Sequence, residues 1–146
     1  MAIYCVAMLL LTFQATSVQR QNVRIENNEF SIQTDAGPRQ ITHDGTPKRL
    51  PVISPDGRRI AYVVDLWVVN VRSAAVSGAP EDVVETDLQG NVLRHIIPEG
   101  YVPEQFERLE WIDDQRIGAR TIGRANCFYW ILNADTGKTL KKWRAD

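Results

Sequence analysis

The chain of 146 residues is poor in side chains that bind metals or form disulfides, since it has two cysteines and two histidines. Cys5 lies in an apolar N-terminal segment, which leaves Cys127 without a partner for an internal disulfide. The aromatic residues after Cys127 favour a buried strand position for it. His43 and His95 have no Cys-x-x-Cys or His-x-x-x-His companion, and a zinc site needs three or four ligands. We therefore expect no metal, no cofactor and a core held by packing.

The sequence also lacks an excess of charge of either sign. Its 17 Lys and Arg residues nearly balance its 18 Asp and Glu residues. A nucleic-acid binder needs a basic face that displaces counterions from phosphates, so the balance argues against a nucleic-acid partner. It gives equally little reason to expect a polyanionic or membrane-surface partner.

Sequence signatures of catalysis are missing as well. Neither a Gly-x-Ser-x-Gly elbow nor a Gly-rich phosphate loop occurs, and no Asp-x-Asp-x-Asp-Gly run suggests a calcium loop. A paired-carboxylate enzyme needs two acids in one pocket, whereas each candidate acid here adjoins a turn signal, where Asp bonds local backbone amides. These acids are Asp44, Asp56, Asp113 and Asp114. We expect no catalytic residues.

The N-terminal segment differs from the rest of the chain. Residues 1–13 carry no charged side chain, and this apolar stretch is too short to span a bilayer comfortably. Ala15 and Ser17 place small residues at positions −3 and −1 of a cut before Val18. We expect a signal peptide over 1–17, a periplasmic or secreted mature chain, and no stable membrane span after its removal. A buried N-terminal strand or helix, or a misplaced start codon, is the alternative.

Helical periodicity is almost absent from residue 18 onward. The apolar runs are short and rich in β-branched and aromatic residues, and clusters of Gly, Pro, Asp and Asn interrupt them at short intervals. Such clusters stand at 35–38, 43–45, 54–57, 77–80, 89–91, 113–115 and 135–137. This pattern indicates strands joined by hairpins.

Two kinds of hairpin alternate along the chain. Segments 30–42, 83–96 and 129–143 share a β-prone run, a turn ending in glycine and a second strand with basic residues. The turn glycines are Gly37, Gly90 and Gly137. Segments 50–64 and 109–121 share a different plan, with a shorter turn in the second copy. Two hairpins make a four-stranded unit of about 50 residues, the size of a β-propeller blade.

A specific resemblance covers residues 39–71. The series is RQIT (39–42), DG (44–45), PVISPDGRRIAY (51–62) and LWVVNV (66–71). It closely resembles the WD-like propeller repeat of TolB-type proteins, and it is similar to blades in the propellers of prolyl-oligopeptidase-type peptidases. Residues 83–143 follow the repeat in register, but Asp-Asp-Gln at 113–115 stands where the repeat has Pro-Asp-Gly.

The SPDG turn of this repeat has a physical basis. Pro55 presets φ for the first central position, Asp56 bonds backbone amides, and Gly57 supplies the positive φ that follows. The hydroxyl of Ser54 is expected to cap the turn. The two arginines at 58–59 begin the return strand, at an end that we expect to be exposed to solvent.

The expected fold is all-β, with antiparallel four-stranded blade-like sheets. One domain over 18–146 would hold a closing hairpin at 22–42, a blade at 48–97 and a second blade at 107–144. This makes about two to two and a half blades, whereas a closed β-propeller needs roughly four to eight. Because uncovered sheet faces and edges invite pairing, we expect a protein partner or a homo-oligomer that completes the propeller.

Tryptophans and basic residues supply the candidate contact surface. Strand placement favours the core for Trp67, Trp111 and Trp130. Trp143 instead lies in a mixed basic and aromatic tip near the C-terminus, and aromatic residues and Arg are enriched at interface hot spots. The candidate protein contacts, from this tip and the 101–106 loop, are Tyr101, Phe106, Lys141, Lys142, Trp143 and Arg144.

The resemblance implies a non-catalytic protein-binding or scaffold module of the cell envelope, which is the role of TolB-type propellers. The repeat contains none of the candidate contact residues, so it implies no particular partner. Two alternatives stay open. One is an accessory or orphaned propeller piece of a hydrolase or peptidase, and the other is a truncated fragment without independent function.

Overall fold

The computed structural model describes residues 23–65, 81–99, 105–123 and 126–145. Four predicted features lie outside these residues: the signal peptide at 1–17, the strand at 66–71 with Trp67, the turn cluster at 77–80 and the contact residue Tyr101. In the residues that are described, the regular structure is entirely β, which confirms the all-β part of the predicted fold. No helix in these residues is long and apolar enough to cross a membrane.

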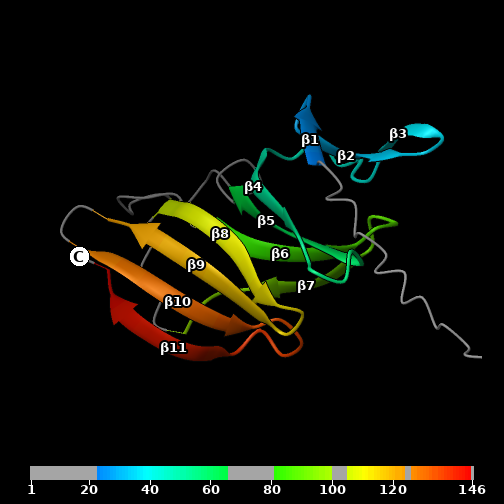
Figure 1. Ribbon diagram of the computed structural model, residues 1–146. Coiled ribbons are helices and arrows are strands. Elements are labelled where there is room, and N and C mark those ends of the chain that lie inside the picture. Colours follow the sequence, from blue (N-terminus) through cyan, green and yellow to red (C-terminus); the bar gives the residue numbers. More distant parts are fainter. Residues whose placement is uncertain (1–22, 66–80, 100–104, 124–125, 146) are drawn as a thin grey trace, which may run out of the picture.

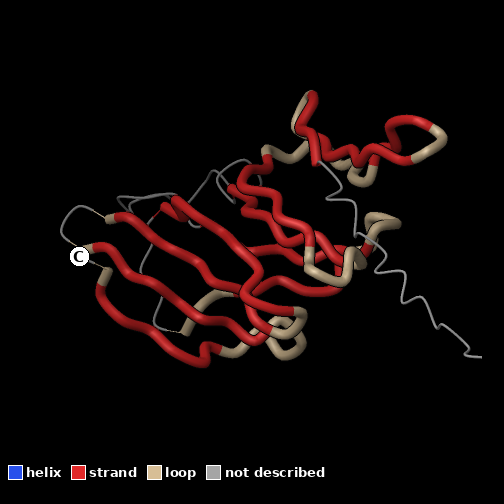
Figure 2. Tube along the Cα trace, in the orientation of Figure 1, coloured by secondary structure: helices blue, strands red, loops and turns tan. Residues whose placement is uncertain are grey.

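The described chain forms eleven strands in three antiparallel sheets (Figures 1 and 2). The strands are β1 (Val23–Glu26), β2 (Glu29–Thr34), β3 (Gly37–Gln40), β4 (Lys48–Ile53), β5 (Arg59–Asp65), β6 (Glu81–Asp87), β7 (Val92–Ile96), β8 (Gln105–Asp113), β9 (Arg116–Ile122), β10 (Cys127–Asn133) and β11 (Thr139–Arg144). Sequence neighbours pair within each sheet, so β1–β3, β4–β7 and β8–β11 are consecutive meanders. The two predicted four-stranded sheets are present.

The N-terminal sheet has one strand more than the hairpin expected at 22–42. Asn27 and Asn28 join β1 to β2 with φ values of 51° and 68°. Positive φ at both central residues is the geometry of a tight hairpin turn, and Asn tolerates it better than most residues. The expected hairpin is β2–β3, and the asparagine turn adds β1 to its edge.

Glycines close the hairpins where the sequence predicted them. Gly37, Gly90 and Gly137 have φ values of 109°, 87° and 72°, and they lie in the β2–β3, β6–β7 and β10–β11 turns. Gly90 also packs closely against a segment far away in the sequence. A Cβ atom at Gly90 would overlap the backbone carbonyl of Ile41, which follows β3. The β6–β7 turn is therefore fitted against the chain that leaves the N-terminal sheet.

The SPDG turn has the bonding expected of it. The amide of Gly57 donates to the carbonyl of Ser54 at 2.8 Å, and the Ser54 hydroxyl donates to the Asp56 carboxylate at 2.5 Å. The amide of Arg59 donates to the Ser54 hydroxyl at 3.0 Å, which closes the turn from the other side. Pro55 is exposed, whereas Ser54 is buried because its hydroxyl lies inside the turn.

The sheet β4–β7 is covered on both faces. Alternate residues of β5 point to opposite sides: Ile60 and Tyr62 pack toward β1–β3, while Ala61 and Val63 pack toward β8–β11. The first cluster includes Phe30, whose ring meets that of Tyr62 edge to face at 4.8 Å between centroids. Burial of both faces explains why β5 is almost continuously apolar.

The β8–β11 sheet covers the other side of β4–β7. The rings and aliphatic groups that it contributes to the shared core are Phe106, Leu109, Ile117, Trp130 and Leu132. The first strands of the three sheets lie beside one another, because β4 contacts both β1 and β8. Figure 1 shows the resulting order, with β4–β7 between the N-terminal and C-terminal sheets.

We expect Gly90→Ala to lower the free energy of unfolding by roughly 2–4 kcal/mol, because the new methyl group adds a clash with the Ile41 carbonyl to the strain of a positive φ. Gly57→Ala is the matched control, since φ is 70° there and a Cβ would meet no atom within 4 Å. That control should lose only about 1 kcal/mol. Urea denaturation measures both, and equal losses would contradict the close packing at Gly90.

Candidate functional site

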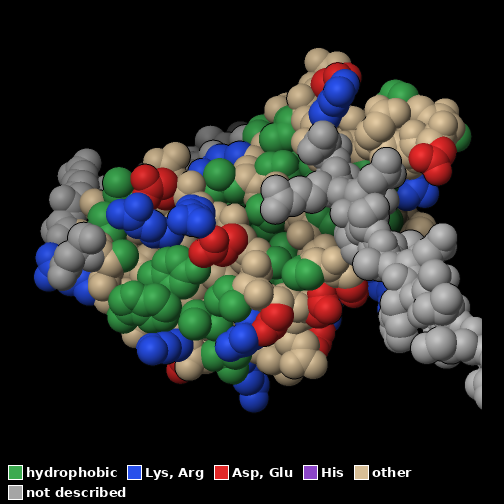
Figure 3. All heavy atoms as spheres, viewed as in Figure 1, with side chains coloured by type: hydrophobic (Ala, Val, Ile, Leu, Met, Phe, Trp, Pro, Cys, Tyr) green, Lys and Arg blue, Asp and Glu red, His purple; other side chains and the backbone are tan. Residues whose placement is uncertain are grey.

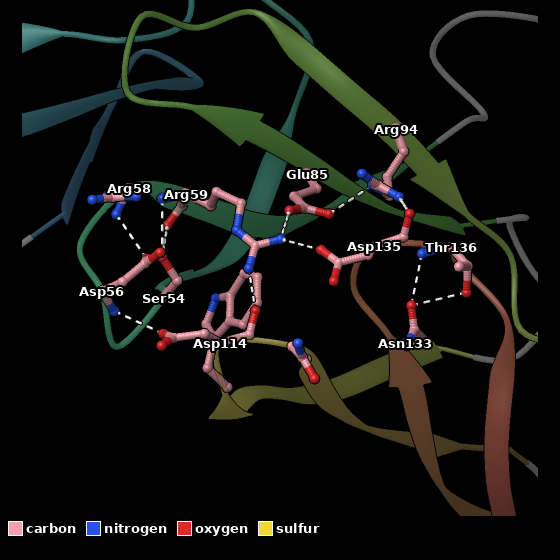
Figure 4. A network of polar contacts seen from close by, with 12 residues as sticks. Ser54, Asp56, Arg58, Arg59, Glu85, Arg94, Asp114, Asn133, Asp135 and Thr136 are labelled. Atoms are coloured by element: carbon pink, nitrogen blue, oxygen red, sulfur yellow. Dashed lines mark hydrogen bonds and ion pairs between the residues drawn. The ribbon is translucent and has the colours of Figure 1, made fainter.

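Two places in the described structure gather the chemically notable side chains. One is a polar network where the turns of β4–β7 meet the turns of β8–β11 (Figure 4). The other is the face of β8–β11 that points away from β4–β7, called the open face below (Figure 3). The first contains the SPDG turn, and the second contains part of the predicted C-terminal contact tip.

Arg59 is the centre of the polar network. Its guanidinium donates to the Glu85 carboxylate at 2.8 Å and to the Asp135 carboxylate at 3.1 Å, and it also donates to the backbone carbonyl of Asp114. It lies 4.9 Å from the ring centroid of Trp111. Arg59 was expected at a solvent-exposed end, but only 16% of its side chain is exposed, because the β8–β11 turns cover it.

Glu85 is a fully buried carboxylate between two arginines. Arg94 lies across from it on β7, and its Nε atom is 2.9 Å from the carboxylate without hydrogen-bond alignment. Burial raises the pKa of Glu85 above its ordinary value, and the charges of Arg59 and Arg94 only partly offset this effect. The two arginines therefore reduce, but do not cancel, the free-energy cost of holding this carboxylate in the interior.

The turns on either side of the network also bond directly to each other. The amide of Asp56 donates to the Asp114 carboxylate at 2.9 Å, and Arg94 donates to the carbonyl of Asp135. Burial alone would raise the pKa of Asp56, but hydrogen bonds from Ser54 and from the Arg58 amide hold it below its ordinary value. Figure 4 shows these acids turned toward arginines or backbone amides. The network joins two sheets, and its groups bond one another.

The acids of the network do not form a ligand set for a metal ion. Across the described ranges, no three His, Cys, Asp or Glu side chains are grouped so that they could hold one. A second cross-sheet contact has the same character: Glu81, which is buried, accepts from Arg49 and, at 2.7 Å, from the Phe106 amide. Both arrangements connect β4–β7 to β8–β11.

Phe106 is a correction to the predicted contact residues. It was placed in a loop open to a partner, but it lies in β8 and its ring is fully buried in the core. The β8–β9 register shifts between Phe106 and Arg108, and this irregularity lets Phe106 and Leu109, three residues apart, both face β4–β7. The predicted core positions of Trp111 and Trp130 agree with the structure, since both pack in this region and Trp130 is 1% exposed.

The predicted C-terminal tip is divided between two faces of β11. Lys142 lies over the rings of Phe128 and Trp130, at 4.3 and 4.1 Å from their centroids. Arg144 is opposite Phe128 in the register and is therefore on the same side. Lys141 and Trp143 alternate with them and belong to the open face. The four residues do not form one cluster.

Trp143 and Tyr129 form the centre of the open face. They are directly opposite each other in the β10–β11 register, and their ring centroids are 4.7 Å apart. Trp143 is 39% exposed, and the Lys141 ammonium lies 5.2 Å from its ring. The Tyr129 hydroxyl donates to the Glu110 carboxylate, and burial together with this bond raises the pKa of Tyr129 to about 12. The tyrosine is thus a fixed hydrogen-bond donor beneath an exposed indole.

Two ion pairs between arginine and glutamate lie beside these rings. Arg108 lies 2.7 Å from Glu110, and Arg120 lies 3.3 Å from Glu107. Ile122, which is 41% exposed, extends the apolar part of the face along β9. Figure 3 shows hydrophobic side chains gathered over β9–β11 with Lys, Arg, Asp and Glu around them. No other sheet of the described chain packs on this side.

Sequence reasoning missed most of the open face. Tyr129, Arg120 and Glu110 were not among the predicted contacts. In the register, Tyr129 is opposite Trp143, Arg120 is opposite Tyr129, and Glu110 is diagonal to Arg120. The available signal was the alternation of β8 to β10, but it identifies a face only once the strand pairing is known.

Comparisons with protein-family models and with curated proteins found no match to this chain.

Replacing Arg59 tests the importance of the network. Arg59→Ala should lower the free energy of unfolding by about 3–5 kcal/mol, because it removes one of the two cations that compensate the buried Glu85. Arg58→Ala is the matched control on the adjacent exposed residue and should change it by less than about 0.5 kcal/mol. Urea denaturation compares the two variants. Similar losses in both would contradict a central role for Arg59.

The raised pKa of Glu85 gives stability a pH dependence of definite sign. The contribution of Glu85 to stability is complete below its unfolded value of 4.5, and it is lost as pH rises through the higher folded-state pKa. Glu85→Gln does not titrate at this position. The unfolding free energy of the wild type minus that of the variant should therefore fall as the pH rises above 4.5. A difference that rises instead would mean that the arginines outweigh burial.

Proposed function

We propose that this chain is a non-catalytic protein-binding module of the cell envelope, built as part of a β-propeller, and that the open face of β8–β11 is its contact surface. The apolar N-terminal segment supports export, and the WD-like repeat supports a TolB-type relationship. The observation that carries the proposal is the exposed Trp143 packed against Tyr129, in a face with no covering sheet in the described chain.

The order of the sheets supports the propeller part of this proposal. Consecutive sheets are stacked face to face, their strands run in sequence order, and their first strands are adjacent. The SPDG turn of one four-stranded sheet bonds to the corresponding turn of the next through Asp56 and Asp114. Blades of a propeller are related in this way, with each sheet burying its faces against its neighbours.

The chemistry of the open face supports protein binding over catalysis. Trp, Tyr and Arg are the residues most enriched at interface hot spots, and all three are present there. The carboxylates on this face are engaged by Arg108, Arg120 and Tyr129. Such an arrangement presents stacking surfaces and positioned charges, which orient a partner.

The test is site-specific photocrosslinking in the cells that produce the protein. A benzophenone amino acid at position 143 keeps an aromatic ring on the open face, and it should give one adduct of discrete mass in the envelope fraction. The same amino acid at position 92 is the matched control, because Val92 is a 52% exposed strand residue of another sheet. Absence of an adduct at 143, or equal adducts at both positions, would refute the open face as the contact surface.

A further inference from the structure

The two four-stranded sheets can be compared position by position, because the Arg-Ile step that opens β5 recurs at the start of β9. One row across the β4–β7 face that meets β8–β11 is Val63, Val83 and Ile96. The corresponding row on the open face is Arg120, Tyr129 and Trp143. The first row is at most 1% exposed, whereas Trp143 of the second is 39% exposed.

This replacement changes what the face can pack against. Three aliphatic side chains fit a dry contact between sheets, but an arginine, a phenol and an indole carry polar groups that need partners when buried. The open face is therefore not equipped to receive another sheet in the way that β4–β7 receives β8–β11. Its polar groups are typical of the outer face of a terminal repeat.

The N-terminal sheet, at the other end of the three stacked sheets, also has an outer face that is poorly suited to pack against another sheet. On the β1–β3 face that points away from β4–β7, one row is Arg24, Ser31 and Gln40. A head-to-tail ring of copies would press this polar row onto the aromatic row of the open face. Neither end then offers the largely apolar surface that both internal contacts use.

We propose that the open face of β8–β11 is covered by a second copy of itself, in a two-fold, face-to-face dimer. This inference rests on the proposed function, in which the open face is the contact surface. A two-fold contact brings the same patch of each copy together, so the patch must complement itself. The open face does, because it carries cations, carboxylates and ring surfaces side by side.

Both orientations of the two-fold axis give favourable pairings. With the axis along the strands, the β8–β9 half of one copy lies over the β10–β11 half of the other, so Arg108 and Arg120 face the rings of Trp143 and Tyr129. With the axis across the strands, the β8–β9 halves meet, and the arginines of one copy face Glu107 and Glu110 of the other.

The size of the face predicts a dimer that dissociates readily. Four strands about 4.8 Å apart and six residues long, at about 3.3 Å per residue, make a sheet of roughly 400 Å² on each copy. The total of about 800 Å² is below the roughly 1,200 Å² at which stable specific interfaces begin, in the range of weak or transient complexes. We therefore expect a concentration-dependent equilibrium between monomer and dimer.

Sedimentation equilibrium over a concentration series tests the dimer, on the protein purified in the form that the producing cells accumulate. Twice the mass of one chain should appear at the highest concentrations, and Trp143→Ala should raise the dissociation constant at least ten-fold. Leu140→Ala is the matched control, because Leu140 is 53% exposed on the same strand but belongs to no row of the open face. It should leave the constant within about two-fold of the wild type.

Arg108→Glu is a second variant that keeps the test decisive if Trp143→Ala disturbs folding. The Arg108 side chain is 65% exposed, so the change should not affect the core, but it places a third carboxylate beside Glu107 and Glu110 and should also weaken the dimer at least ten-fold. A monomer at every concentration, a larger closed ring, or a dimer that both variants leave unchanged would overturn the inference. A monomer whose position 143 crosslinks to a different protein would overturn the dimer while leaving the proposed function in place.

Discussion

The carboxylate of Glu85 is buried between two sheets, and the joint between those sheets depends on how its charge is compensated. Arg59 reaches it from the strand that follows the SPDG turn, and Arg94 reaches it from the neighbouring strand. The same two arginines bond to the turns of β8–β11 at Asp114 and Asp135. A group that is costly to bury thus has its compensation supplied by residues that also connect the sheets.

This joint orients the open face. Because β8–β11 is held against β4–β7 by the shared core and by the network of Arg59, the opposite side of β8–β11 is presented as one rigid surface. Tyr129 lies on β10, which pairs with β9 on one side and with β11 on the other. Trp143 lies on β11, the edge strand, which pairs with β10. Contact residues on strands are held in position more precisely than residues on loops, which suits recognition by a flat surface.

Local signals explain why so much of the fold followed from the sequence. Gly37, Gly90 and Gly137 mark turns through their own backbone freedom, and the SPDG turn bonds within itself. The roles of Arg59 and of the open face could not be read in this way, because they depend on which strands pair and which faces are covered. For the same reason Phe106 was predicted as an exposed contact, and Lys142 was grouped with residues of the opposite face. A one-residue step along a strand changes the face on which a side chain lies. The signal peptide stays a prediction.

Coverage of β4–β7 on both faces also has a kinetic consequence. Its inner strand β5 carries apolar side chains on both faces, so the sheet buries its apolar surface only when both neighbouring sheets are in place. Intermediates in which β4–β7 stands alone would expose two hydrophobic faces at once. Folding and unfolding of the three sheets should therefore be strongly cooperative, with the middle of the chain acquiring its structure together with both ends.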